Sequence, residues 1–135
     1  MIGLDTNVLV RYLTQDDPVQ SAQANAFIEQ QLSPAEPGVI GHIVLCEVGW
    51  VLSRAYGYSR KQVADALSAL LTCREFQVES PDLGILALQD YLHGTADFSD
   101  YLLGRAHRRL GARYTATFDH KAAESSQFML LASAF

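Results

Sequence analysis

Five carboxylates stand at positions where a single site could use them. Asp5 and Asp119 each follow a short run typical of a strand, and Glu47 lies in an otherwise apolar helical stretch. Asp97 and Asp100 are three residues apart, so both would project from one face of a helix. Because open α/β sheets form their sites at the carboxyl ends of strands, we expect these acids to contribute to one site.

Carboxylates gathered in this way commonly bind hard divalent cations. We expect Asp5 to be buried, where an ionised carboxylate is costly unless it is paired or binds a metal. The neighbours of Glu47 are also too apolar for an ordinary solvated glutamate. Mg²⁺ and Mn²⁺ prefer oxygen ligands, and they can generate hydroxide or hold a phosphate during in-line displacement. The chain has no glycine-rich phosphate loop, which argues against an NTPase.

Four of the five acids also have a purely structural explanation. Asp5, Asp97 or Asp119 could cap the helix that follows it. Glu47 could be a partly exposed helix residue. Any one of these explanations is tolerable alone, but the matched positions of the whole set favour a shared site.

Alternating strand and helix patterns must position these acids. Strands are expected at residues 2–4, 39–40, 76–78 and 114–117. Helices are expected at residues 7–13, from 16–18 to about 32, 43–56, 59–71, 81–93 and 97–110, with a short helix and an apolar run, 128–131, at the end. This order predicts an α/β sandwich with a short parallel sheet, and right-handed crossovers would place helices on both of its faces.

Length and charge are compatible with one domain that acts on a polyanion. The 135 residues suit a single domain, residues 1–135, with one core. The net charge of −5 at first argues against nucleic-acid binding, which usually needs a basic surface. The chain has 10 basic and 15 acidic residues, so the surface outside the five proposed site acids would be neutral. Bound metal would offset the charge of the site itself.

Cellular location and cysteine chemistry can also be inferred. No apolar run approaches the roughly 20 residues that would span a bilayer. No basic stretch precedes an apolar one at the N-terminus, so we expect a cytoplasmic protein without membrane contact. Cys46 and Cys73 form no CxxC pair and are expected to be buried thiols, not a disulfide or a zinc site.

Four segments resemble the PIN-domain ribonucleases, and specifically the VapC-type toxins of bacterial toxin–antitoxin pairs. The segments occur in the order and spacing of that family, at residues 2–9, 44–52, 96–103 and 115–119. The resemblance implies a three-layer α/β/α fold with a short central parallel sheet. It also implies RNA cleavage that depends on Mg²⁺ or Mn²⁺, a homodimer, and a cognate antitoxin that holds the enzyme inactive.

The resemblance also assigns roles to individual residues. It implies metal-site roles for Asp5, Glu47, Asp100 and Asp119, with Glu47 either completing the metal's ligands or acting as a base toward the attacking water. Asp97 matches an acidic position common in the subgroup. Three further residues fall where the family places small polar side chains around the pocket, namely Thr6, Asn7 and Thr117.

RNA binding would need positive charge outside the acidic site. Arg105, Arg108 and Arg109 share one helix face and could contact the RNA backbone. An ordinary solvated helix face is the alternative explanation.

Two other functions also remain open. A catalytically inactive PIN-like module would bind RNA or protein without cutting, and a haloacid-dehalogenase-type phosphohydrolase would need an aspartate where Asn7 stands.

Overall fold

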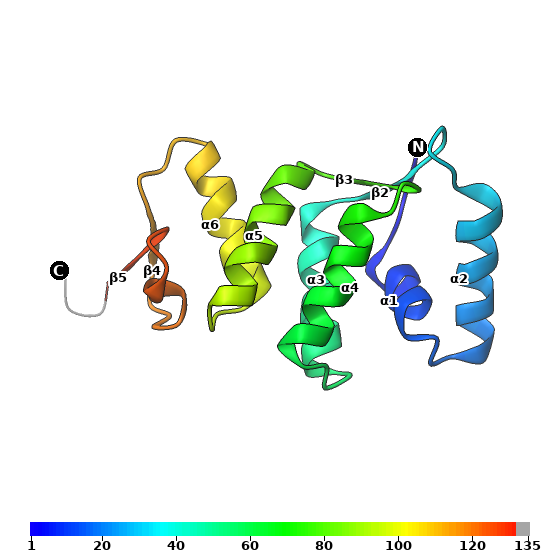
Figure 1. Cartoon of the computed structure of the whole chain (residues 1–135), viewed down its shortest axis with the longest axis horizontal. Coiled ribbons are helices and arrows are strands. Elements are labelled where there is room, and N and C mark those ends of the chain that lie inside the picture. The colour runs from blue at the N-terminus through cyan, green and yellow to red at the C-terminus, as the bar shows by residue number, and fades with distance from the viewer. Residues whose placement is uncertain (132–135) are drawn as a thin grey trace. The chain divides into compact units, whose positions relative to one another are not determined.

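The computed structural model describes residues 1–131, which form two compact units that we describe separately (Figure 1). The first unit extends from Met1 to Pro81 and the second begins at Asp82. In the first unit the elements are β1 (Ile2–Gly3), α1 (Thr6–Thr14), α2 (Pro18–Gln31), β2 (Gly38–Ile40), α3 (His42–Arg54), α4 (Arg60–Thr72) and β3 (Phe76–Val78). From the unit boundary onward they are α5 (Pro81–His93), α6 (Phe98–Arg109), β4 (Thr115–Thr117), the 3-10 helix η1 (Ala122–Glu124) and β5 (Phe128–Leu130).

A parallel sheet organises the first unit. Its strand order is β1-β2-β3, with Ile2 opposite Gly38 and Gly38 opposite Phe76. The strands are two or three residues long, so packing against helices must supply the stability that so few ladder bonds cannot. The largest fully buried side chains of this core come from β2 and the helices, and are Leu9, Ile40, Leu45, Val48, Leu52, Val63, Leu67 and Leu70.

Local capping signals define where the helices of the first unit begin. The Asp17 side chain accepts from the backbone N–H groups of Val19 and Gln20, at 3.1 and 2.9 Å, and Pro18 occupies the first turn of α2. Ser59 and Gln62 form a reciprocal capping box at the start of α4. These helix starts match the sequence prediction because capping is local chemistry.

The second unit pairs two helices with two short parallel strands. Strand β4 is parallel to β5, with Thr115 opposite Phe128. Gly104 of α6 permits close packing against β5, because a β-carbon at that position would lie 2.8 Å from the Phe128 ring. Tyr91 and Phe98 pack edge to face, with ring centroids 6.3 Å apart.

The predicted α/β class with short parallel strands is confirmed. Six helices and small parallel strand groups are consistent with the predicted three-layer α/β/α fold. The final apolar run proves to contain a strand, β5, which the sequence pattern alone did not assign. Helix α3 ends at Arg54, and Gly57 turns the chain afterwards with a positive φ of 66°. That the whole chain is one domain stays a prediction.

The two cysteines are more exposed than the sequence predicts. Cys46 and Cys73 are half-buried, so the prediction of buried thiols is wrong, but neither forms a disulfide within residues 1–131. Within the same residues, no helix combines the length and the apolar character needed to cross a membrane.

Candidate functional site

Asp5 joins the end of β1 to the start of α1. It is the N-cap of α1, with extended backbone (φ −86°, ψ 158°), and its Oδ1 accepts from the Thr6 backbone N–H at 2.7 Å. The prediction that Asp5 is buried is wrong, because its side chain is exposed. Strand β1 ends at Gly3, and the buried position belongs to Leu4. Asp5 is therefore accessible to a ligand from solvent.

Glu47 lies on the exposed face of α3. The buried stripe of this helix consists of Leu45, Val48 and Leu52, and a residue at position 47 falls outside it. The expectation that apolar neighbours would keep Glu47 from solvent is therefore wrong. Leu45 and Val48 face the core, whereas Ile43 and Trp50 share the exposed face of Glu47. Sequence proximity did not distinguish the two faces.

Thr6 connects the two acids of the first unit. Its side chain is buried, with 6% of its surface exposed, and its hydroxyl donates to Glu47 Oε1 at 3.2 Å. Its backbone N–H donates to Asp5, as described above. One residue thus holds one oxygen of each carboxylate. The sequence had indicated only that a small polar residue stood here.

Asp97 and Asp100 form the N-terminal capping box of α6. The Asp97 side chain accepts from the backbone of Asp100, and the Asp97 N–H donates to Asp100 Oδ2 at 3.3 Å. The structural explanation for Asp97 is thus correct. Asp100 is half-buried, and burial raises its pKa. The negative charges of Asp119 and Asp97 raise it further.

Asp119 serves both as a hydrogen-bond acceptor and as a neighbouring charge. Its Oδ1 accepts from the backbone N–H groups of Lys121 and Ala122, at 2.8 and 3.2 Å, in the turn that leads into η1. Its own N–H donates to the Thr117 hydroxyl at 3.0 Å, so Thr117 braces the loop after β4. Because the Asp119 charge also acts on Asp100, these two acids share one electrostatic environment.

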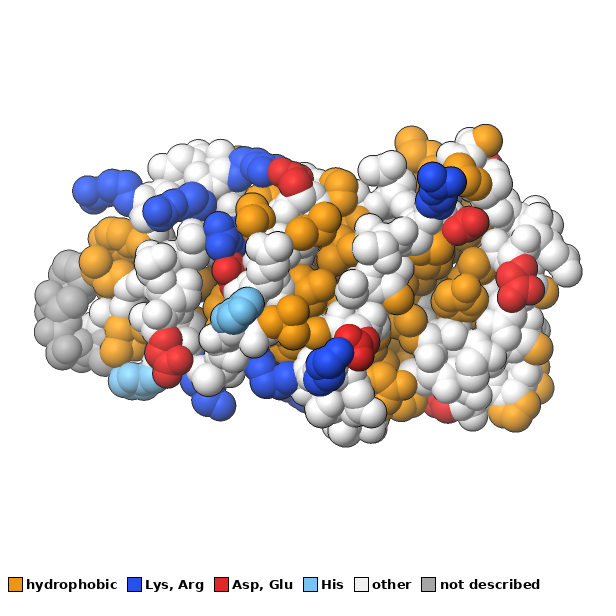
Figure 2. Space-filling view, in the orientation of Figure 1, with side chains coloured by type: hydrophobic (Ala, Val, Ile, Leu, Met, Phe, Trp, Pro, Cys, Tyr) orange, Lys and Arg blue, Asp and Glu red, His pale blue; other side chains and the backbone are white. Residues whose placement is uncertain are grey.

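Two of the three predicted RNA-contacting arginines form ion pairs with carboxylates of helix α5. Arg105 binds Asp90 through two bonds of 2.7 Å, and Arg109 forms an ion pair with Asp82. Among the described residues, 1–131, Arg108 donates only to the neutral backbone carbonyl of Arg113, at 3.2 Å. The carboxylates on α5 were missed in the sequence because their contact depends on how α5 and α6 pack. In Figure 2 several basic side chains, in blue, lie over the upper end of α6 and beside the loop that leads from it to β4.

The acids suit a hard divalent cation by donor type. Asp5 and Glu47 supply oxygen donors in the first unit, and Asp100 and Asp119 supply them in the second. The pKa of Asp100 is raised first by burial and then by the charges of Asp119 and Asp97, and a bound cation would offset that repulsion. Within residues 1–131, no three acidic, histidine or cysteine side chains are arranged to hold a metal ion by themselves.

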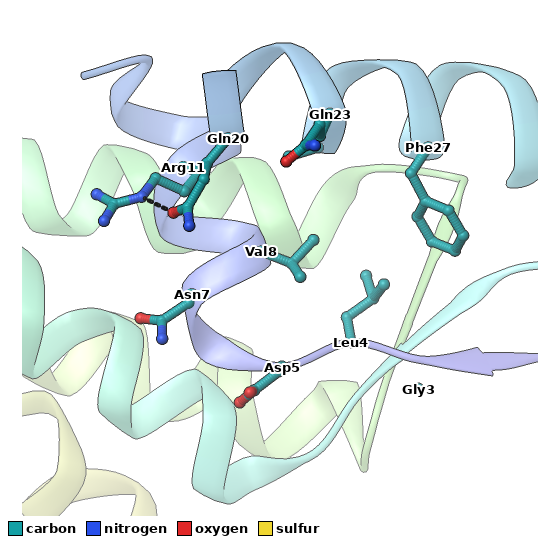
Figure 3. Close-up of a pocket in the computed structure, with 10 residues that line it drawn as sticks. Gly3, Leu4, Asp5, Asn7, Val8, Arg11, Gln20, Gln23 and Phe27 are labelled. Atoms are coloured by element: carbon teal, nitrogen blue, oxygen red, sulfur yellow. Dashed lines mark hydrogen bonds between the residues drawn. The ribbon is translucent and has the colours of Figure 1, made fainter. Parts of the chain in front are cut away.

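A hollow lies beside Asp5, between α1 and α2 (Figure 3). Asn7, one of the predicted pocket residues, is exposed and lines this hollow together with Asp5. Residues from α2 complete its wall, and Gln23 and Phe27 are among them. Sequence reasoning missed these two residues, because nothing in the pattern of α2 distinguishes a pocket wall from a solvent face.

Fold and residue types together define an α/β protein with exposed carboxylates at strand ends and helix starts. The model of the PIN domain family matches residues 2–123, and the chain belongs to this family. PIN domains are typically nucleases and generally bind divalent metal ions. No curated protein and no solved structure matches the chain. All four acids proposed for the metal site lie within the matched residues.

Proposed function

We propose that this protein is a metal-dependent endoribonuclease and the toxin of a toxin–antitoxin pair. The observation that carries the proposal is the PIN family match over residues 2–123, which includes all four proposed site acids. Resemblance to the VapC-type toxins supports the finer assignment to RNA and to a toxin role. Like those toxins, the protein would act in the cytoplasm as a homodimer and be held inactive by a cognate antitoxin.

The proposed metal ligands are Asp5, Asp100 and Asp119, with Glu47 as a fourth ligand or as a base. When bound, Mg²⁺ or Mn²⁺ would polarise the scissile phosphate and acidify the attacking water. Thr6 holds one oxygen of Asp5 and one of Glu47, which limits the rotamers of both carboxylates before any ligand arrives. Such preorganisation reduces the cost of assembling a charged site.

Proton movement in the proposed reaction depends on Glu47. As a base, its carboxylate would accept a proton from the water that attacks the phosphate, while solvent protonates the departing oxygen. The hydroxyl of Thr6 occupies only Oε1, so Oε2 is available for this proton. In the alternative role, the same oxygen would complete the metal's ligands.

A metal-dependence experiment tests this function. Purified protein is incubated with structured RNAs in EDTA, and Mg²⁺ or Mn²⁺ is then added back. We expect no cleavage in EDTA and internal cleavage after either metal is restored. Cleavage that persists in EDTA would contradict the metal-dependent mechanism, and RNA that stays intact with both metals would contradict the nuclease assignment.

An inactive PIN-like binding module is the second candidate function. The observation that favours it is that the Asp97 and Asp119 side chains accept hydrogen bonds from nearby backbone N–H groups. Both acids therefore already have a structural role. This candidate predicts RNA binding without cleavage in the experiment above.

The antitoxin assignment is tested separately, by asking whether a small protein encoded in the adjacent reading frame co-purifies with the chain and suppresses cleavage.

A further inference from the structure

The hollow between α1 and α2 has an apolar floor. Its volume is about 490 Å³, within the roughly 300–1,000 Å³ typical of small-molecule pockets. Leu4 is buried at its base, and Val8 and Phe27 are half-buried on opposite helices. Figure 3 shows the Phe27 ring extending from α2 toward the side of the hollow that Leu4 and Val8 occupy. The floor therefore offers both an aliphatic surface and an aromatic face.

Amide side chains line the polar edge of this hollow. Asn7 on α1 and Gln23 on α2 are exposed, and within residues 1–131 neither side chain has a hydrogen-bond partner. Gln20 is already engaged, because its Oε1 accepts from Arg11 Nε at 2.8 Å. Each unpaired amide presents a donor and an acceptor together, the pattern that reads the edge of a nucleobase.

The hollow adjoins a proposed metal-site residue. Asp5 contributes to its lining, at the point where β1 passes into α1. A nucleotide whose phosphate is held near Asp5 through a bound cation would have its base close to the hollow. The aromatic and amide groups are those by which proteins recognise unstacked bases in single-stranded RNA.

We propose that this hollow is a nucleobase pocket, in which Phe27 stacks on one base of the substrate RNA while Asn7 and Gln23 read its edge. The inference rests on the proposed nuclease function and adds the residues that select where the RNA is cut. A peptide segment of a partner protein is the other occupant that an apolar floor would accept. The experiment below separates the two.

Cleavage-site mapping and binding test the pocket with matched variants. Ends produced from an RNA pool of random sequence are sequenced for the wild type, Gln23→Leu, Phe27→Leu and the control Gln30→Leu. Gln30 is an exposed glutamine of α2 outside the hollow. In parallel, Asp5→Asn protein carrying each substitution is titrated by fluorescence anisotropy with short oligoribonucleotides that differ in one base.

We expect Gln23→Leu to flatten the base preference beside the cut. Phe27→Leu should weaken oligonucleotide binding about tenfold, the size of one lost stacking contact. Gln30→Leu should match its parent. Unchanged preference and affinity in both pocket variants would overturn the pocket, and this is also the result if a peptide occupies the hollow. Base-selective binding without wild-type cleavage would instead overturn the nuclease function and leave the pocket intact.

Discussion

At the scale of single residues, Asp5 combines a structural and a proposed chemical role. Asn also serves well as an N-cap, so Asp5→Asn should preserve α1 while removing the charge. We expect RNA cleavage to fall about a hundredfold or more, with an unchanged melting temperature. Asp17→Asn, at the N-cap of α2, is the matched control and should cleave normally. An Asp5→Asn protein that cuts RNA at the wild-type rate would show that the metal site is wrongly assigned.

Thr6 allows a test of preorganisation that leaves both acids in place. Thr6→Val keeps the buried shape but removes the hydroxyl that donates to Glu47. We expect kcat to drop roughly 10- to 100-fold, the range seen when groups that orient a metal site are lost. Thr6→Ser should restore most of the rate, since it restores the hydroxyl. Equal activity of the valine and serine variants would mean that this hydrogen bond does not contribute to catalysis.

The pKa of the Asp16 carboxyl is strongly lowered. Its pKa is lowered to about 2, first by the Tyr56 hydroxyl, then by the Thr14 hydroxyl, with a smaller effect from Arg11. Because the folded pKa lies below the unfolded one, Asp16 stabilises the fold at neutral pH. That contribution is lost as the pH falls from about 4 through 2.

Tyr56→Phe tests this arrangement by removing the largest cause of the shift. The pKa of Asp16 should rise toward its ordinary value, as followed by NMR titration of its carboxyl carbon. Stability of the variant should then decline at a higher pH than that of the wild type. A pKa of Asp16 that stays near 2 in Tyr56→Phe would assign the shift to Thr14 and Arg11 instead.

At the scale of elements, Gly94 fixes the approach between the end of α5 and the start of α6. A β-carbon there would overlap the Tyr101 hydroxyl and lie 3.1 Å from the backbone oxygen of Asp90. That hydroxyl is itself fixed, because it accepts from the Ala96 N–H at 3.2 Å. We expect Gly94→Ala to lower the free energy of unfolding by about 1–3 kcal/mol, measured by urea denaturation.

Two further variants make the Gly94 prediction specific. Gly3→Ala is the control, since nothing lies within 4 Å of a β-carbon at Gly3. Tyr101→Phe removes the overlapping hydroxyl and should recover part of the loss when combined with Gly94→Ala. Strictly additive effects of the two substitutions would indicate that the alanine acts elsewhere.

Helix starts were predictable from the sequence because their chemistry is local. The Asp17-Pro18 pair, the Ser59 capping box and the Asp97 cap each involve residues within one turn. Strand β5 and the exposure of Glu47 were not predictable in the same way. Strand β5 forms by pairing with β4 across ten intervening residues. The exposure of Glu47 depends on which face of α3 packs against the core.

At the scale of the whole molecule, a net charge of −5 leaves few cations for a polyanionic substrate. Of the three predicted contact residues, Arg108 is the one that forms no ion pair within residues 1–131. We expect Arg108→Ala to weaken RNA binding at low salt and to reduce the salt slope of log affinity by about 1. Arg105→Ala should mainly lower stability, by about 1 kcal/mol, through loss of its pair with Asp90.

Binding titrations at several salt concentrations distinguish these two arginines. An unchanged salt slope in Arg108→Ala would show that Arg108 does not contact the RNA.

The sequence alone predicted the basic helix face but not which of its arginines form ion pairs, because the partners Asp82 and Asp90 lie on another helix. The four candidate acids were found from residue type and strand position, whereas their exposure and hydrogen-bond partners required the structure.

The double use of Asp119 restricts which amino acids its position can accept. Asn would still accept from the Lys121 and Ala122 N–H groups but lose the charge that acts on Asp100, and Glu would retain a charge but change the reach of the accepting oxygen. Aspartate alone meets both requirements. In the proposed nuclease, a chain with Asn at position 119 would therefore fold but lose activity, so folding and activity would place different requirements on this position.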